Sequence, residues 1–294
     1  MPDLTDSHRA FIQGFITYRD FDAEQLRALV ASTIVPATSP APAEGEDETA
    51  PETAPETAPE SAPATPAVAP ENITQDVIDQ YVLIANSALH EFDLEIRSAK
   101  SQIDGTLIWA LVNMRSDEFM SLATTYAPEQ IDLFKLVLDE IFVEQNDAST
   151  NEVLAVKSMV ILNKSANVKM TKAATQKCLD AFVADGWLFR SKTGYYTLTQ
   201  RALLELGTYL VNTYNHRDDE DEAPRVKRCT ACQDIVLMGQ RCRTKTCLTR
   251  FHDFCSATYF RAKRSTKCPL CQADWEEGHD AVGERAGVVQ LAPR

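Results

Sequence analysis

Seven of the eight cysteines lie between residues 229 and 271, and one histidine lies among them. Thiolate and imidazole groups are the ligands that zinc prefers, and a closed structural site uses four of them. Eight such side chains therefore predict two zinc ions and no open catalytic position. In chain order, the pattern C4HC3, they are Cys229, Cys232, Cys242, Cys247, His252, Cys255, Cys268 and Cys271.

The spacing of these residues indicates which of them share an ion. Three pairs have two intervening residues, so that each pair can hold one metal from a tight turn. The longer intervals between the pairs favour an interleaved, cross-brace arrangement. We expect one ion to be held by Cys229, Cys232, His252 and Cys255, and the other by Cys242, Cys247, Cys268 and Cys271.

The charge of this region differs from that of the whole chain. The chain has a formal net charge of −14, yet residues 225–271 contain eleven Lys and Arg against two acids. Seven thiolates exceed the charge of two zinc ions, so we expect nearby bases to offset the difference. A nucleic-acid surface is then not needed to explain them. No G-x4-GK[ST], H-E-x-x-H or G-x-S-x-G pattern occurs, which argues against the corresponding classes of hydrolase.

The N-terminus lacks the charged and apolar regions of a secretory signal, and no apolar run is long enough to span a bilayer. We therefore expect a soluble intracellular protein with no membrane partner. Clustered cysteines in such a protein favour metal over disulfides. The remaining cysteine, Cys178, lies on a predicted helix, where we expect a small buried apolar side chain.

Helical periodicity over 7–19, 22–35 and the region after Ile73, followed by a hairpin near Gly105, predicts a winged-helix domain at 1–120. The Ala/Pro/Glu/Thr-rich segment 36–71 interrupts it and is predicted to be disordered.

The same order of elements repeats in residues 121–214, with Thr171 as a helix N-cap and Gly186 as a stop signal. The predicted fold is mostly α with small β-hairpins: tandem winged-helix domains and then a two-zinc variant RING. The remaining segments are an acidic linker at 215–224, the zinc domain at 225–275 and a disordered tail at 276–294.

The ligand order resembles both PHD fingers and RING domains. PHD fingers usually carry an aromatic residue two positions before the seventh ligand, where this chain has Thr266. RING domains often carry Pro directly after the seventh ligand and Trp shortly after the eighth, and Pro269 and Trp275 match that pattern. The RING interpretation is therefore favoured.

A RING implies a ubiquitin ligase that orients a charged conjugating enzyme and forms no covalent intermediate itself. The groove of active RINGs then implies contacts to the conjugating enzyme from Ile235, Val236, Pro269 and Leu270. Two positions differ from strongly active RINGs. Ala231 is smaller than the aliphatic residue common before the second ligand, and Gln272 stands where Arg or Lys often contacts ubiquitin.

Tandem winged helices before a C4HC3 RING, with segments such as "FVADGWLFRSKTGYYTLTQRALLELGTYL", resemble the family of non-structural-maintenance-of-chromosomes element one, the RING subunits of the SMC five–six complex. The resemblance implies a MAGE-like partner that stimulates ligase activity, a kleisin partner, a chromatin-associated nuclear location and a role in DNA repair by recombination.

Two other functions stay open. The zinc module could be a non-catalytic docking surface in a scaffold subunit, for which Ala231 and Gln272 argue. The second winged helix could bind DNA, because it carries a local excess of bases that could follow phosphates. These bases are Lys169, Lys172, Lys177, Arg190 and Lys192.

Overall fold

The structure is a computed structural model that describes residues 4–34, 68–114, 125–147, 151–215, 223–276 and 280–288. Most of the insert predicted at 36–71 and of the linker predicted at 215–224 lies outside these residues. The described elements are mainly helices with small sheets, which confirms the predicted fold class. No described helix is both long and apolar enough to cross a membrane.

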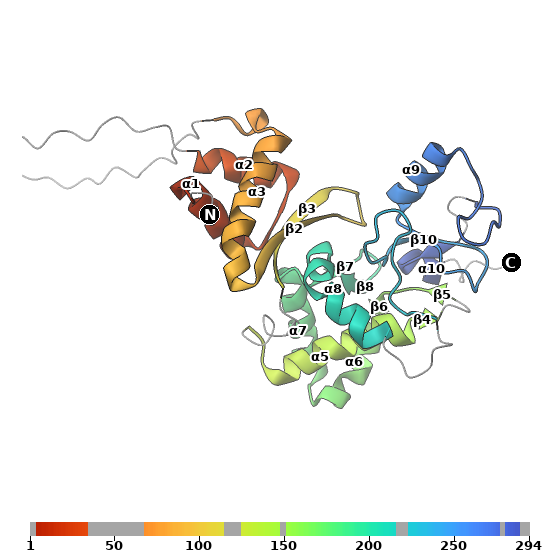
Figure 1. Cartoon of the computed structure of the whole chain (residues 1–294). Helices are drawn as coiled ribbons and strands as arrows, with labels where there is room; N and C mark the ends of the chain where they lie inside the picture. The colour runs from red at the N-terminus through yellow and green to blue at the C-terminus, as the bar shows by residue number, and fades with distance from the viewer. Residues whose placement is uncertain are drawn as a thin grey trace, which may run out of the picture. The chain divides into compact units, whose positions relative to one another are not determined.

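The chain divides into two compact units at Phe92–Asp93. The first unit is a set of helices whose aromatic side chains pack edge to face, as between Phe11 and Phe15. Asp22 caps its second helix by accepting hydrogen bonds from the backbone N–H groups of Glu24 and Gln25. The elements of this unit are α1 (Asp6–Tyr18), β1 (Asp20–Asp22), α2 (Ala23–Thr33), a 3-10 turn (Pro70–Asn72), α3 (Gln75–Leu89) and a second 3-10 turn (His90–Phe92) (Figure 1).

The second unit begins with the predicted hairpin, formed by β2 (Leu94–Lys100) and β3 (Leu107–Asn113). The strands pair antiparallel along their whole length. Gly105 adopts a φ of 75° in the connecting turn, a conformation that costs glycine little. The hairpin therefore ends in a tight, ordered turn.

The second winged helix follows, and its ends match their sequence signals. The Thr171 hydroxyl accepts a hydrogen bond from Ala174 N–H, and Gly186 ends the same helix at a φ of 73°. Three strands form a sheet in the order β6-β8-β7. The elements are α5 (Pro128–Asp139), a π-helical continuation (Glu140–Glu144), β4 (Asn146–Asp147), β5 (Asn151–Glu152), β6 (Val156–Lys157), α6 (Ser158–Lys164), a 3-10 turn (Ser165–Val168), α7 (Lys172–Ala184), β7 (Leu188–Arg190), β8 (Tyr195–Leu198) and α8 (Gln200–Asn215).

The zinc module contains β9 (Gly239–Arg241), β10 (Arg250–Phe251) and α9 (Asp253–Lys263). Residues 280–288 correct the prediction of a disordered tail over 276–294, because they form β11 (Ala281–Val282) and α10 (Glu284–Val288). β11 pairs with β9 as the third strand of the sheet, and Val282 is buried. The composition of residues 280–288 gives no signal for a strand. The segment is ordered by its strand pairing with β9 and by the burial of Val282.

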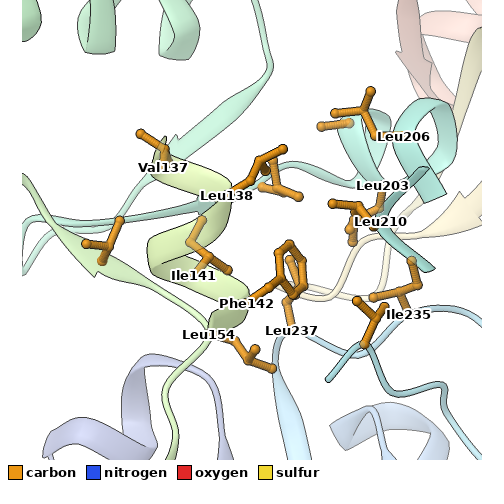
Figure 2. Packing of buried hydrophobic residues seen from close by; sticks show 14 of the residues in the cluster. Val137, Leu138, Ile141, Phe142, Leu154, Leu203, Leu206, Leu210, Ile235 and Leu237 are labelled. Atoms are coloured by element: carbon orange, nitrogen blue, oxygen red, sulfur yellow. The ribbon is translucent and has the colours of Figure 1, made fainter. Parts of the chain in front are cut away.

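The second winged helix and the zinc module share one hydrophobic core. Apolar side chains from the end of α5, from α8 and from the segment after the first cysteine pair pack together. Figure 2 shows Phe142 between Ile141 and the α8 side chains Leu203 and Leu210, and Leu206 of α8 and Ile235 and Leu237 of the zinc module belong to the same cluster. The two parts therefore bury apolar side chains against each other.

Candidate metal centres

The structure brings the eight predicted ligands together in two groups. Each group offers four ligand atoms that all lie within 4.8 Å of one another. The groups have the interleaved composition expected from the spacing. They are Cys229, Cys232, His252 and Cys255 in the first centre, and Cys242, Cys247, Cys268 and Cys271 in the second.

Each centre uses one C-x2-C turn of the same construction. In the first turn Cys229 N–H donates to Asp234 O, and Gln233 N–H donates to Cys229 O. In the second turn Cys268 N–H donates to Ala273 O, and Gln272 N–H donates to Cys268 O. The residue after each pair, Gln233 or Gln272, adopts a positive φ of 66° or 62°.

A two-strand ladder explains the interleaving. Phe251 of β10 pairs with Gln240 of β9. The chain continues from β9 to Cys242 of the second centre and from β10 to His252 of the first centre. Gly239 is the first residue of β9. A Cβ atom on this residue would lie 2.0 Å from the carbonyl oxygen of Phe251, so the two strands can approach this closely only because residue 239 is glycine. One short ladder thus sets the positions of ligands in both centres.

The donor set and its distances fit zinc. Cys242 Sγ lies 3.4 Å from Cys271 Sγ, and Cys247 Sγ lies 3.6 Å from Cys268 Sγ. Four sulfurs at zinc bonding distance in a tetrahedron lie about 3.8 Å apart, whereas a disulfide brings two sulfurs to about 2 Å. None of the eight cysteines is in a disulfide.

The thiols of these centres need a cation in order to ionise together. Burial raises the pKa of Cys242 to about 12 and that of Cys255 to about 11, whereas hydrogen bonds lower the pKa of Cys229 and of Cys271 to about 6, so each centre holds thiols of both kinds. At neutral pH the thiols with a raised pKa stay protonated unless a positive charge compensates the thiolate. A divalent cation held by four ligands supplies this charge, so the electrostatics agree with the geometry.

His252 is oriented for coordination through Nδ1. Its Nδ1 lies 3.3 Å from Cys232 Sγ, while its Nε2 lies 3.2 Å from the carbonyl oxygen of Ile235. A carbonyl oxygen only accepts, so Nε2 carries a proton, and in the neutral imidazole Nδ1 then keeps its lone pair. The histidine then offers an unprotonated nitrogen to the first centre.

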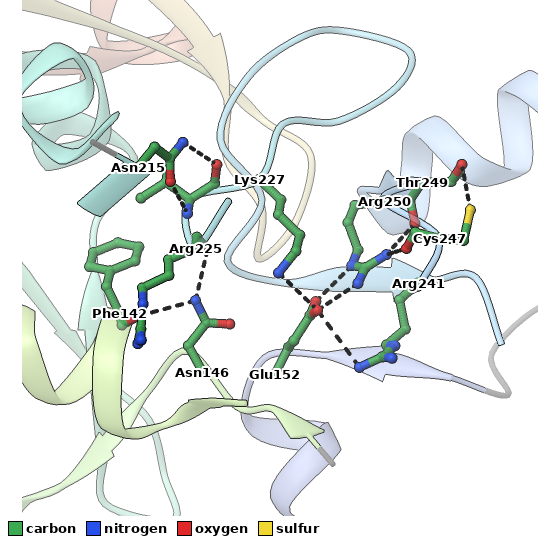
Figure 3. A network of polar contacts seen from close by, with 11 residues as sticks. Phe142, Asn146, Glu152, Asn215, Arg225, Lys227, Arg241, Cys247, Thr249 and Arg250 are labelled. Carbon is green, nitrogen blue, oxygen red and sulfur yellow. Dashed lines mark hydrogen bonds and ion pairs between the residues drawn. The ribbon is translucent and has the colours of Figure 1, made fainter. Parts of the chain in front are cut away.

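The buried bases beside the centres are engaged by a carboxylate rather than by the sulfurs. Glu152 of β5 is 1% exposed and lies between three bases of the zinc module (Figure 3). Its Oε1 and Oε2 lie 2.5 and 2.7 Å from Nη2 and Nε of Arg250. Its Oε1 also lies 3.0 Å from Lys227 Nζ and 3.7 Å from Arg241 Nη1. We expected the bases of this module to offset the charge of the thiolates, but Lys227, Arg241 and Arg250 pair with the Glu152 carboxylate instead.

The sulfurs of the second centre are contacted by hydroxyls instead. Thr249 Oγ1 lies 3.4 Å from Cys247 Sγ and 3.3 Å from Cys268 Sγ. Thr244 Oγ1 lies 3.7 Å from Cys271 Sγ. Sequence reasoning missed these threonines and Glu152. The one available signal for Glu152 was that it is an acid in a segment rich in bases.

The four residues expected to contact a conjugating enzyme differ in exposure. Leu270 is 65% exposed and Pro269 is half-buried. Ile235 and Val236 are only 5% and 2% exposed. Ile235 packs toward α8, where its Cδ1 lies 3.7 Å from the position of a Cβ on Gly207. In this structure the accessible part of the expected groove is therefore the Pro269–Leu270 side.

The five bases named as a possible DNA surface are all exposed. Lys172 Nζ is hydrogen bonded to Asn163 Oδ1 at 3.2 Å, and the Arg190 guanidinium lies 5.8 Å from the centroid of the Tyr196 ring. These two contacts are local. DNA binding by this domain stays a prediction.

Cys178 is 3% exposed, as predicted for a buried small side chain, and burial raises its pKa to about 11. It belongs to neither metal-ligand group.

Comparison with known protein families gives two matches along the chain. Residues 8–206 match the family model described as "Nse1 non-SMC component of SMC5-6 complex". Residues 229–271 match the model described as "RING-like domain". The two matches together span both winged helices and the two metal centres.

Curated relatives match over most of their own length. The chain is 31% identical over 208 residues to the human "Non-structural maintenance of chromosomes element 1 homolog", which covers 71% of this chain and 73% of the relative. It is 28% identical over 201 residues to "Non-structural maintenance of chromosomes element 1" of Schizosaccharomyces pombe, which covers 68% of this chain and 76% of the relative.

A solved chain from an "Nse1-Nse3-Nse4 complex" superposes with a TM-score of 0.67 at 23% identity. The superposition covers 94% of this chain and 98% of the solved one. At this identity the match shows that the fold is shared across nearly the whole chain.

Proposed function

Because this chain belongs to the family of the Nse1 non-SMC component of the SMC5-6 complex, we propose that it is the RING-type ubiquitin ligase subunit of such a complex. The observation that carries the proposal is a RING-like module with two complete four-ligand centres and an exposed apolar side chain, Leu270, between two ligands. The residue before it, Pro269, matches the Pro after the seventh ligand that active RINGs use in the groove for the conjugating enzyme.

The proposed partners follow from the family. The similar solved chain comes from a complex named Nse1-Nse3-Nse4. We propose that this chain likewise assembles with a MAGE-like Nse3 subunit and a kleisin Nse4 subunit, at chromatin in the nucleus, and acts in DNA repair by recombination. The MAGE-like subunit is proposed to stimulate ubiquitin transfer.

The mechanism requires no nucleophile from this chain. The zinc module binds a ubiquitin-charged conjugating enzyme and holds its thioester in a reactive geometry, so that orientation lowers the barrier. Pro269 and Leu270 supply the apolar contact. The eight ligands of the two centres would hold zinc, which would crosslink the loops and offset most of the thiolate charge. The shared core with α8 keeps this surface rigid.

We expect that replacing both Pro269 and Leu270 with alanine lowers the discharge of ubiquitin from a charged conjugating enzyme about tenfold, because truncating a central apolar contact costs about 1.4 kcal/mol or more. The measurement uses the zinc-loaded full chain with its MAGE-like partner. Leu248→Ala is the matched control. Leu248 is also exposed, at 44%, and directly follows Cys247, a ligand of the second centre, to which Cys268 and Cys271 also belong. An equal loss in both variants would argue against a specific contact.

The residue after the eighth ligand gives a second test. Gln272→Arg is expected to raise discharge about tenfold, because a guanidinium there can donate several hydrogen bonds to ubiquitin. Gln233→Arg is its control, since Gln233 occupies the equivalent place in the first C-x2-C turn with nearly the same φ. If both substitutions raised discharge equally, the gain would reflect added charge alone.

A non-catalytic docking role is the second candidate. The burial of Ile235 and Val236 favours it, because half of the expected groove is then inaccessible. If the role is docking alone, the zinc-loaded protein bound to its partner should discharge no ubiquitin from any of a panel of conjugating enzymes. The Gln272→Arg variant should then discharge none either.

A further inference from the structure

The turn of the β2–β3 hairpin lies against the zinc module, and the Gln102 side chain makes three hydrogen bonds to the backbone of the module. Gln102 Nε2 donates to the carbonyl oxygen of Ile235 at 2.9 Å. Gln102 Oε1 accepts from the backbone N–H groups of Leu237 and Met238 at 2.8 and 3.0 Å. Both ends of the amide therefore hold the backbone that follows the first C-x2-C turn.

The carbonyl that Gln102 holds is also the partner of a metal ligand. The oxygen of Ile235 accepts from Nε2 of His252 as well as from Gln102. A carbonyl oxygen has two lone pairs, so it accommodates both donors. Through this oxygen Gln102 fixes the acceptor that sets the tautomer and the ring orientation of His252.

The face of the His252 ring is covered by Phe254 of α9, and the same hairpin lies against Phe254. The Phe254 ring stacks on the His252 ring, with centroids 5.3 Å apart and planes at 13°. Lys100 Nζ lies 5.5 Å from the centroid of Phe254, and a Cβ on Gly105 would lie 3.7 Å from the Phe254 Cδ1 atom. The edge of the imidazole and its face are thus both supported from residues 100–105.

The second centre has a different kind of support. Its sulfurs are contacted by Thr244 and Thr249, which belong to the zinc module itself. The hairpin instead reaches the metal ligands through the Ile235 carbonyl and Phe254, both of which contact His252, and its further bonds to Leu237 and Met238 involve no ligand atom. The two centres therefore differ in what positions their ligands, although their C-x2-C turns are alike.

We propose that Gln102 is a positioning residue for the first metal centre, and that the β2–β3 hairpin controls how firmly this centre, and not the second, retains its ion. The inference rests on the zinc loading proposed above. Groups that orient a metal-bound histidine change metal affinity by about 10–100-fold when they are removed. Gln102 acts through the Ile235 carbonyl, so we place its effect at about tenfold.

The test is the rate at which a chromogenic chelator removes zinc from the full chain. Gln102→Met keeps the length of the side chain and removes both hydrogen-bonding ends. We expect one of its two ions to leave about tenfold faster than in the wild type and the other to leave at the wild-type rate. Gln102→Glu keeps the acceptor for Leu237 and Met238 but loses the donor to Ile235, so the same ion should leave faster.

Cadmium substitution identifies the affected centre without any activity measurement. A centre with three sulfurs and one nitrogen and a centre with four sulfurs give separate cadmium-113 NMR resonances. In Gln102→Met the first resonance is expected to shift or broaden while the four-sulfur resonance stays in place. Ile103→Ala is the control, because Ile103 lies in the same turn and is 58% exposed.

Two results would overturn the inference in a variant that still loads two ions. One is unchanged release of both ions, and the other is equal acceleration of both, which would indicate a general loss of stability. A wild-type chain that loads fewer than two ions would instead contradict the zinc proposal itself. A wild type that loads both ions but discharges no ubiquitin would contradict the ligase proposal and leave the role of Gln102 standing.

Discussion

Replacing Glu152 with glutamine is expected to lower the free energy of unfolding by about 3–5 kcal/mol, the usual cost of removing one member of a buried ion pair. The carboxylate is the shared partner of Arg250, Lys227 and Arg241, which are 1%, 8% and 8% exposed. A neutral amide would leave these cations buried without their shared counter-charge. Denaturant unfolding of the zinc-loaded protein measures the change.

The pH dependence of this stabilisation has a definite sign. Burial acts to raise the pKa of Glu152, but the hydrogen bonds and charge of Arg250, with Lys227 and Arg241, lower it from 4.5 to about 2. A depressed folded-state pKa stabilises the protein fully above 4.5, and this contribution is lost as the pH falls toward 2. The stability difference between Glu152→Gln and the wild type should therefore be constant from pH 6 to pH 8.

An exposed ion pair in the same module provides the control. Glu276 lies 3.4 Å from Arg243, and both side chains are more than half exposed. Glu276→Gln should change the free energy of unfolding by less than about 1 kcal/mol. If Glu152→Gln were equally mild, the network in Figure 3 would not be a buried ionic contact in solution.

The metal-ligand groups could be predicted from sequence because their chemistry is local. Each C-x2-C pair forms a turn whose geometry depends on few residues, and the H-x2-C pair lies at the start of α9. Eight ligands in paired spacing leave few ways to form two closed sites. The winged-helix elements were likewise predictable where caps such as Thr171 and stops such as Gly186 mark their ends.

The contacts between distant segments could not be predicted in this way. Ile235 and Val236 were expected in an accessible groove because they are apolar and near the first ligand pair. Their burial is set by the shared core, in which Ile235 packs toward α8, about thirty residues away in sequence. Glu152 and Gln102 are ordinary polar residues in short strands and turns. Only the tertiary structure brings them to the zinc module.

The shared core makes removal of the metal the perturbation with the largest expected effect. Structural zinc contributes about 10–16 kcal/mol in small peptide models, which exceeds the total stability of many domains. Without its ions the zinc module is expected to unfold. Its residues Ile235 and Leu237 would then leave the core that they share with α8.

Chelation is therefore expected to remove hydrogen-exchange protection from α8 as well as from the zinc module. The apolar face of α8, with Leu203, Leu206 and Leu210, loses part of its cover when the segment 235–237 detaches. Exchange measured with and without a chelator tests this for the whole chain. Cys268→Ser removes a ligand of the second centre and should expose α8 to exchange without any chelator. Cys178→Ser is the control, because Cys178 is a buried cysteine outside both centres, and it should leave the zinc content unchanged. Full protection of α8 in metal-free protein would show that the winged helix folds independently and that the zinc module only rests on it.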